Sequence, residues 1–430
     1  MGTVDGPARG RDRAALTAAS RRRLFWLLAT GYVVAASAWL SWHATAAGDY
    51  LTDAGPSIDA LVHGRLHAFL AGRPVMGPLS LLIRAPFAGF ALLGSHSGLQ
   101  DLYNDEYRLG VFPCVVAAGL VGLAIARMME QRGSSRWAQA AVVVLAVVNP
   151  VSLRAIFYEH PEEVFGAALL VGAALAGVRR RPWLAAILLA FALMNKQWAV
   201  IGAPAVLLII WLANDRRRLR GPALTLLGVA LLLVIPLLAV DAGSLWDMTR
   251  RMADLRGTPV WPASIWYRYV PPLSGAELGR WAHYLHHMPD WLGLLSRPFI
   301  IVLGIALPLA FAKRVAADVA GRGLALLALV MLIRCAFDPA NNGYYHVPFL
   351  MAVLAADAVR GRFWATGAAC VLLQVPTTLK PSADDLALFY SVWAPAFAVY
   401  LGGRAYGLDW AARLGAARKL PGSGDDFSPA

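Results

Sequence analysis

The chain is predicted to be an all-α membrane protein, a helical bundle of about twelve transmembrane spans with amphipathic helices beside the membrane. Its composition indicates this class, because 58% of its 430 residues are hydrophobic and only 15% are charged, against roughly 25% charged in soluble domains. Its basic residues fall in short runs between apolar stretches, as expected of loops at a cytoplasmic membrane surface. The net charge of +13 therefore does not indicate nucleic-acid binding.

The first apolar run covers residues 24–42, which at about 1.5 Å per residue nearly matches a hydrocarbon core of roughly 30 Å. Three consecutive arginines precede it and predict a cytoplasmic N-terminus. No small-residue cleavage site follows the run, so we expect a retained helix. We predict disordered cytoplasmic tails at residues 1–20 and 421–430, and one transmembrane domain over residues 21–420.

Eleven further apolar runs follow the first. They cover residues 109–127, 137–150, 162–178, 183–196, 198–213, 222–240, 298–312, 323–337, 346–359, 362–376 and 388–403. Basic clusters occupy every second connection, which predicts both termini in the cytoplasm. One more run, residues 79–94, would break this alternation and contains Arg84 and Pro86. We expect it to be a re-entrant or interface-lying helix, because a charge at the bilayer centre costs at least about 3 kcal/mol.

Residues 43–78 are predicted to form the first outer loop, which carries two carboxylates. Asp49 and Asp53 are four residues apart, so they share a face if the segment is helical. Pro56 then suits the start of an amphipathic helix over residues 57–70, too short to span the membrane.

The polar side of this short helix carries ionisable groups at four-residue intervals. They are Asp59, His63 and His67. Two interpretations stand: a solvated polar face with Asp53 as a helix cap, or a site for a divalent metal ion. No cofactor is required by the sequence.

A second outer group precedes the run at residues 162–178. Pro161 with Glu162 and Glu163 in the first turn predicts a helix start. Capping does not explain Arg154 and His160 nearby. Ionisable groups at a membrane boundary need partners or a wet cavity, so we favour a functional role.

Two further groups supply cations at the same boundary. Lys196 lies between two closely spaced apolar runs, where it can snorkel to water or bind a lipid phosphate. The other group comprises Arg334, Asp338, Asn341, Asn342, Tyr344, Tyr345 and His346. An Arg334–Asp338 salt bridge is one interpretation, but so many donors in one turn favour a polar ligand.

The longest outer connection is predicted at residues 241–296 and is rich in tryptophan and histidine. Interfacial aromatic belts explain the tryptophans, although aromatic rings also stack on sugars. His283, His286 and His287 do not match a standard zinc motif, so we expect no metal there.

These features together resemble the GT-C superfamily of polytopic glycosyltransferases and, more loosely, actinobacterial family-87-like polyprenol-phosphate sugar (mannosyl) transferases. The resemblance lies in a first helix leading directly to an acidic outer loop, in interface helices and in about twelve spans. The segments around His160, Lys196 and Asp338 also look like those of actinobacterial relatives.

The resemblance implies a polyprenyl-phosphate sugar donor and a glycan or glycolipid acceptor of the cell envelope, with mannose or arabinose as the sugar. Asp49 or Asp53 would be the catalytic base. The cations that would hold the donor phosphate are Lys196, Arg334, Arg154 and His346. The residues that would orient these cations or bind sugar and acceptor are Asp59, His160, Glu162, Glu163, Asp338, Asn342 and Tyr345. Transfer would occur on the extracytoplasmic face of a bacterial plasma membrane.

The same chemistry follows from the residues themselves. Attack on an anomeric carbon needs a carboxylate to accept the acceptor's proton and cations to stabilise the departing phosphate. The alternative is a transporter or flippase for a lipid-linked or small polar solute. Transporters place ionisable groups near the midplane and often contain inverted repeats, whereas here the groups lie at one boundary and no repeat is evident.

Overall fold

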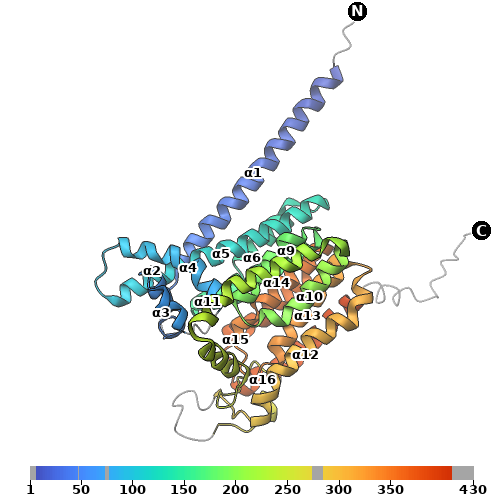
Figure 1. Ribbon diagram of the computed structural model, residues 1–430. Coiled ribbons are helices and arrows are strands. Elements are labelled where there is room, and N and C mark those ends of the chain that lie inside the picture. Colours follow the sequence, from blue (N-terminus) through green and yellow to red (C-terminus); the bar gives the residue numbers. More distant parts are fainter. Residues whose placement is uncertain (1–5, 47, 73–76, 274–283, 409–430) are drawn as a thin grey trace, which may run out of the picture.

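The computed structural model describes residues 6–46, 48–72, 77–273 and 284–408. Within these ranges the chain is helical without a β-strand, and isolated bridges join only Val260 and Pro272 to His286. The all-α prediction is therefore confirmed for the described residues. The helices are α1 (Gly6–His43), α2 (Gly55–Val62), α3 (Leu66–Ala71), α4 (Pro78–Ala88), α5 (Leu99–Gln131), α6 (Arg136–Val147), α7 (Pro150–Phe157), α8 (Pro161–Val178), α9 (Pro182–Asn195), α10 (Ala199–Ala213), α11 (Arg220–Ala253), α12 (Asp290–Val315), α13 (Val319–Phe337), α14 (Val347–Arg360), α15 (Trp364–Leu379) and α16 (Ala383–Tyr406) (Figure 1).

Local sequence explains where many of these helices begin and end. Proline occupies the first or second position of α4, α7, α8, α9 and α14, where its missing N–H is not needed. The Asn149 side chain accepts hydrogen bonds from the backbone N–H groups of Val151 and Ser152 and so caps α7. Helices α14 and α16 end at Gly361 and Gly407, whose positive φ suits glycine.

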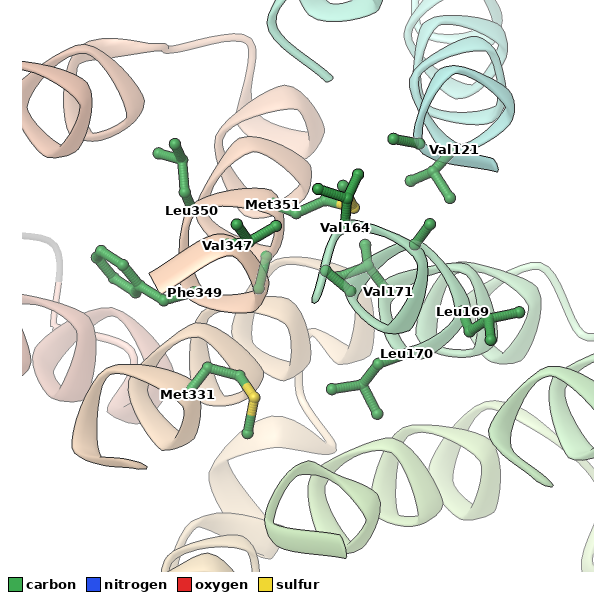
Figure 2. Close-up of a cluster of buried hydrophobic side chains, with 14 of the residues drawn as sticks. Val121, Val164, Leu169, Leu170, Val171, Met331, Val347, Phe349, Leu350 and Met351 are labelled. Carbon is green, nitrogen blue, oxygen red and sulfur yellow. The ribbon is translucent and has the colours of Figure 1, made fainter. Parts of the chain in front are cut away.

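Helix α8 lies at the centre of the bundle, with 89% of its apolar stretch buried, whereas α11 has 6% buried. Figure 2 shows Val164 and Val171 of α8 beside Val347 and Met351 of α14. In Figure 1 the N-terminal part of α1 extends away from the rest of the protein. The acidic first turn of α8 therefore belongs to a buried central helix, whereas α1, α11 and α12 lie at the periphery of the bundle.

Eight helical stretches of the described chain are long and apolar enough to cross a membrane, and they coincide with eight of the predicted runs. This supports a multi-pass membrane protein. The other four predicted runs correspond to α9, α10, α14 and α15, which are 14, 15, 14 and 16 residues long. Such helices cover only about 21–24 Å, so the total of twelve spans stays a prediction.

The prediction of a single amphipathic helix at residues 57–70 is wrong. The structure has two helices there, α2 and α3, separated at Gly64, whose φ is +68°. Glycine adopts this conformation at little cost, and it breaks the helical repeat. Asp53 lies in a π-helical turn, Tyr50–Ala54, and does not cap α2. His67 therefore lies on a different helix from Asp59.

The connection expected at residues 241–296 is partly helical. Helix α11 is interrupted at Asp241, where φ is −159°, and is helical again up to Ala253, while α12 begins at Asp290. The interruption coincides with the predicted end of the apolar run at residue 240, and the outer side of this connection stays a prediction. His283 lies outside the described residues.

The predicted tails are described only in part. Helix α1 begins at Gly6, so the chain is helical from this residue, where a disordered segment over residues 1–20 was expected. Residues 421–430 lie outside the described part of the chain.

The run predicted not to span, residues 79–94, forms α4 and a 3₁₀ turn, Gly89–Leu93. The Gly77 N–H, just before α4, donates to the Asn195 carbonyl at the end of α9. The start of α4 is thereby held beside Lys196. Whether this segment crosses the membrane stays a prediction.

Candidate functional site

Six ionisable residues from four segments meet at the N-terminal end of α8. They come from the loop after α1, from α4, from the start of α8 and from the turn after α9. We call this set the outer ion cluster, after the side of the membrane predicted for it; it comprises Asp49, Arg84, His160, Glu162, Glu163 and Lys196.

Glu162 is the centre of the outer ion cluster and is fully buried. Its Oε1 lies 3.1 Å from Lys196 Nζ and 3.0 Å from His160 Nδ1, and its Oε2 lies 3.7 Å from an Arg84 guanidinium nitrogen. Its place in the first turn of α8 adds the favourable end of the helix dipole. Three cationic groups around one carboxylate allow it to remain charged without water.

Lys196 lies between two carboxylates. Its Nζ is 3.1 Å from Glu162 and 3.5 Å from Glu163, and its side chain is 14% exposed. Burial alone would lower the pKa of Lys196, but the charges of Glu162 and Glu163 raise it. The neighbouring Asn195 side chain donates to the Glu162 carbonyl at 2.9 Å and so fixes this turn to α8. The two carboxylates therefore favour the charged form of Lys196.

His160 connects the buried carboxylate to the outer loop. Its Nδ1 lies 3.0 Å from Glu162 and its Nε2 lies 3.3 Å from Asp49 Oδ2, while its ring stacks on Tyr344 with 4.5 Å between centroids. Burial would lower the pKa of His160, but the Glu162 hydrogen bond and charge outweigh it and raise the pKa. A charged imidazole can donate to both carboxylates.

The two predicted bases are placed differently. The Asp49 side chain is 64% exposed and reaches His160. Asp53 is less exposed; burial raises its pKa, and the positive charges of His160 and Lys196 partly offset this rise. The predicted carboxylates and the predicted cation Lys196 therefore share one region of the protein.

The loop between α7 and α8 holds the π-helical turn in place. The Glu159 carboxylate accepts a hydrogen bond from the Tyr50 backbone N–H. Glu159 itself has φ of +67°, a strained conformation for a residue with a side chain, and such strain is concentrated at functional sites.

Arg334 is a second buried cation at the same end of the bundle. It is 5% exposed and donates to the Tyr345 carbonyl at 2.7 Å. Its guanidinium carbon lies 5.3 Å from the Trp198 ring centroid and 4.7 Å from that of Tyr345. Asp338 lies 3.9 Å from Arg297 instead. Among the residues that the structure describes, no carboxylate forms an ion pair with Arg334.

Tyr345 lies between the two buried cations. Burial raises the pKa of its hydroxyl, while the nearby charges of Lys196 and Arg334 act to lower it. Trp198, two residues after Lys196, covers one face of Arg334. The predicted phosphate-binding residues Lys196 and Arg334 are thus neighbours.

Other predicted site residues lie outside the outer ion cluster. Asp59 pairs with His63 and Arg65. His346 is buried; its Nε2 contacts the Tyr390 hydroxyl at 2.9 Å, and burial lowers its pKa to about 3. Its Nδ1 contacts the Gly343 carbonyl at 3.1 Å, so both ring nitrogens have partners within the protein, and the role of His346 in phosphate binding stays a prediction.

Two more predicted residues have local partners. Arg154 donates to the Leu373 carbonyl at 3.4 Å and packs against Gly343. The Asn342 side-chain amide lies 3.4 Å from the Tyr344 hydroxyl. These contacts support the loop before α14 that carries Tyr345.

The sequence analysis missed Arg84 and Tyr344 as members of the site. An arginine inside an apolar run is itself a signal of function. Its partner Glu162, however, is 78 positions later in the chain, and no sequence pattern indicated that the two would pair. Tyr344 was seen only as one donor in a dense turn, and nothing in the sequence indicated its stacking on His160.

The described residues contain no group of three or more histidine, cysteine or acidic side chains arranged to hold a metal ion. Comparison of the chain with protein-family models, with curated proteins and with solved structures found no match. The case for a function therefore depends on the geometry of the site and on the resemblance described above.

Proposed function

We propose that the protein is a membrane glycosyltransferase with a GT-C-like bundle of about twelve spans. It transfers a sugar, such as mannose or arabinose, from a polyprenyl-phosphate donor to an envelope glycan or glycolipid on the extracytoplasmic face of a bacterial plasma membrane. The observation that carries the proposal is the meeting of outer-loop carboxylates with two buried cations at one end of the bundle.

Asp53 is the proposed base. Burial raises the pKa of Asp53, which makes its carboxylate a better proton acceptor. In the reaction, the acceptor hydroxyl gives its proton to Asp53 while its oxygen attacks the anomeric carbon. The bond from that carbon to the phosphate oxygen breaks, and the phosphate leaves with the electron pair. The configuration of the sugar is inverted.

Arg334 is the proposed phosphate ligand. A buried guanidinium without a carboxylate partner is costly until an anion binds, and its fork geometry matches phosphate. Lys196, by contrast, already has two carboxylates within 3.5 Å. We therefore assign Lys196, Glu162 and His160 as positioning residues that hold Asp49 and the outer loop near the donor.

The test is sugar transfer by the purified protein in lipid vesicles, with a panel of labelled polyprenyl-phosphate sugars. Asp53→Asn is expected to abolish turnover, and Arg334→Gln to weaken donor binding. Asp105→Asn is the matched control, because Asp105 is also an exposed outer carboxylate but pairs with Arg108. Unchanged turnover in Asp53→Asn would refute the base assignment. Lipid flipping or solute uptake without transfer would replace the proposal by a transporter.

A further inference from the structure

The described part of the protein contains an apolar groove of about 690 Å³ at the end opposite the outer ion cluster. It is lined by the start of α9 (Pro182 and Ala186), the second half of α10, the start of α11 and the end of α12. Lys196 follows the other end of α9. The volume lies within the range of ligand-binding sites, roughly 300–1,000 Å³. We call it the basic-side groove.

The rim of the basic-side groove is strongly positive. Eight exposed basic residues lie within three positions along the chain of a residue that lines it. They are Arg180, Arg181, Arg216, Arg217, Arg218, Arg220, Lys313 and Arg314. No aspartate or glutamate lies equally close along the chain. Asp215, the nearest acidic residue, lies 4.0 Å from Arg218.

One contact joins this charge to the apolar wall. The Arg216 guanidinium carbon lies 4.7 Å from the ring centroid of Trp211, and Trp211 lines the groove and is 45% exposed. A cation is therefore held at the mouth by a residue of the wall.

The depth of the groove matches one leaflet. On α10 its lining extends from Pro204 to Trp211, so that with the following turn to Arg216 it covers roughly half of a hydrocarbon core of about 30 Å. The basic loops predict that this end faces the cytoplasm, where the leaflet is rich in anionic lipids.

We propose that the basic-side groove binds an anionic phospholipid, with an acyl chain along α10 and α11 and the phosphate among the arginines at the mouth. The charge of the rim argues for an anionic headgroup, and the purely apolar wall argues for a chain. This inference does not depend on the proposed glycosyltransferase activity.

The experiment is native mass spectrometry of the full chain, delipidated and then titrated with phosphatidylglycerol, phosphatidylcholine or a polyprenyl phosphate. Phosphatidylglycerol is expected to bind more tightly. Replacing Arg216 and Arg217 by glutamine is expected to weaken its binding about thirty-fold, from about 1 kcal/mol for each charge near a membrane surface. The matched control, Arg21→Gln with Arg23→Gln, removes two arginines before the first span and is expected to leave binding unchanged.

A second pair of variants tests the apolar wall. Ala223→Trp fills the groove, whereas Leu224→Trp changes a neighbouring residue that is 68% exposed and does not line it. Loss of phosphatidylglycerol binding in Ala223→Trp alone supports the site. Equal binding of the two lipids, equal effects of both tryptophans, or preferential binding of a polyprenyl phosphate would overturn the assignment to an anionic phospholipid.

Discussion

Replacing Lys196 by methionine removes the cation that two buried carboxylates share. Glu162 and Glu163 are 0% and 1% exposed, and their Oε1 atoms lie 3.1 and 3.5 Å from Lys196 Nζ. Glu162 keeps His160 and Arg84, but Glu163 loses the only ion pair described for it. Breaking a buried pair from one side costs about 3–5 kcal/mol, so we expect Lys196→Met to lower the free energy of unfolding by this amount.

The assay is denaturant unfolding in mixed micelles, with the midpoints followed by tryptophan fluorescence. Adding Glu163→Gln to Lys196→Met removes the unpaired charge and is expected to restore about 2 kcal/mol. The exposed residue Lys313 supplies the control, because Lys313→Met is expected to change stability by less than about 0.5 kcal/mol. A loss below about 1 kcal/mol in Lys196→Met, or no recovery in the double variant, would contradict the buried ion pairs on which the site is built.

Gly166→Ala places a methyl group 2.5 Å from the Asn195 amide nitrogen, which anchors the turn after α9. We expect it to lower the free energy of unfolding by about 1–3 kcal/mol and to reduce turnover. The control Gly172→Ala, whose nearest contact is at 3.5 Å, should melt at the wild-type temperature. Arg404→Met breaks the buried pair with Asp357, whose atoms lie 2.5 Å apart, and should cost about 3–5 kcal/mol without changing turnover per folded molecule. Because the folded-state pKa of His160 is raised, its stabilising contribution is complete below its unfolded pKa of about 6.5 and is lost as pH rises through the folded value. The stability difference between wild type and His160→Gln should therefore shrink with rising pH; a constant difference in pH-dependent melts would show that the histidine does not titrate.

Most helices could be predicted from the sequence because runs of apolar residues indicate which segments are buried in the membrane or in the protein. The start of α8 was predicted correctly from Pro161 and its acidic first turn. One helix prediction failed where backbone conformation overrode hydropathy, at the positive φ of Gly64, whereas the predicted end of the run at residue 240 coincides with the non-helical Asp241. A glycine within an amphipathic pattern, such as Gly64, lowers the expectation of one continuous helix.

The site was predictable in its residue types but not in its pairings. The alternation of basic loops predicted that Asp49, His160 and Lys196 lie on one side of the membrane, and the structure brings these three residues into one cluster. Arg84 was expected at a re-entrant or interface position because an isolated charge is costly in a membrane. In the structure Arg84 lies beside Glu162, whose negative charge offsets this cost. A pairing between residues so far apart in the chain leaves no periodic pattern in the sequence.

Lys196, Arg84 and Arg334, the three enclosed cations near the start of α8, differ in what they can bind. Lys196 and Arg84 surround Glu162, so a phosphate that approached them would compete with a carboxylate already in place. Arg334 contacts aromatic faces and one carbonyl; the charges of Glu163 and Asp338 act on it from a distance, but no carboxylate among the described side chains forms an ion pair with it. On the proposed function, an anionic donor would therefore be bound at Arg334, while the Glu162 network would order the loop that carries the proposed base. On this division Arg334→Gln should impair donor binding at every pH, whereas Glu162→Gln should chiefly change the pH dependence of turnover through His160.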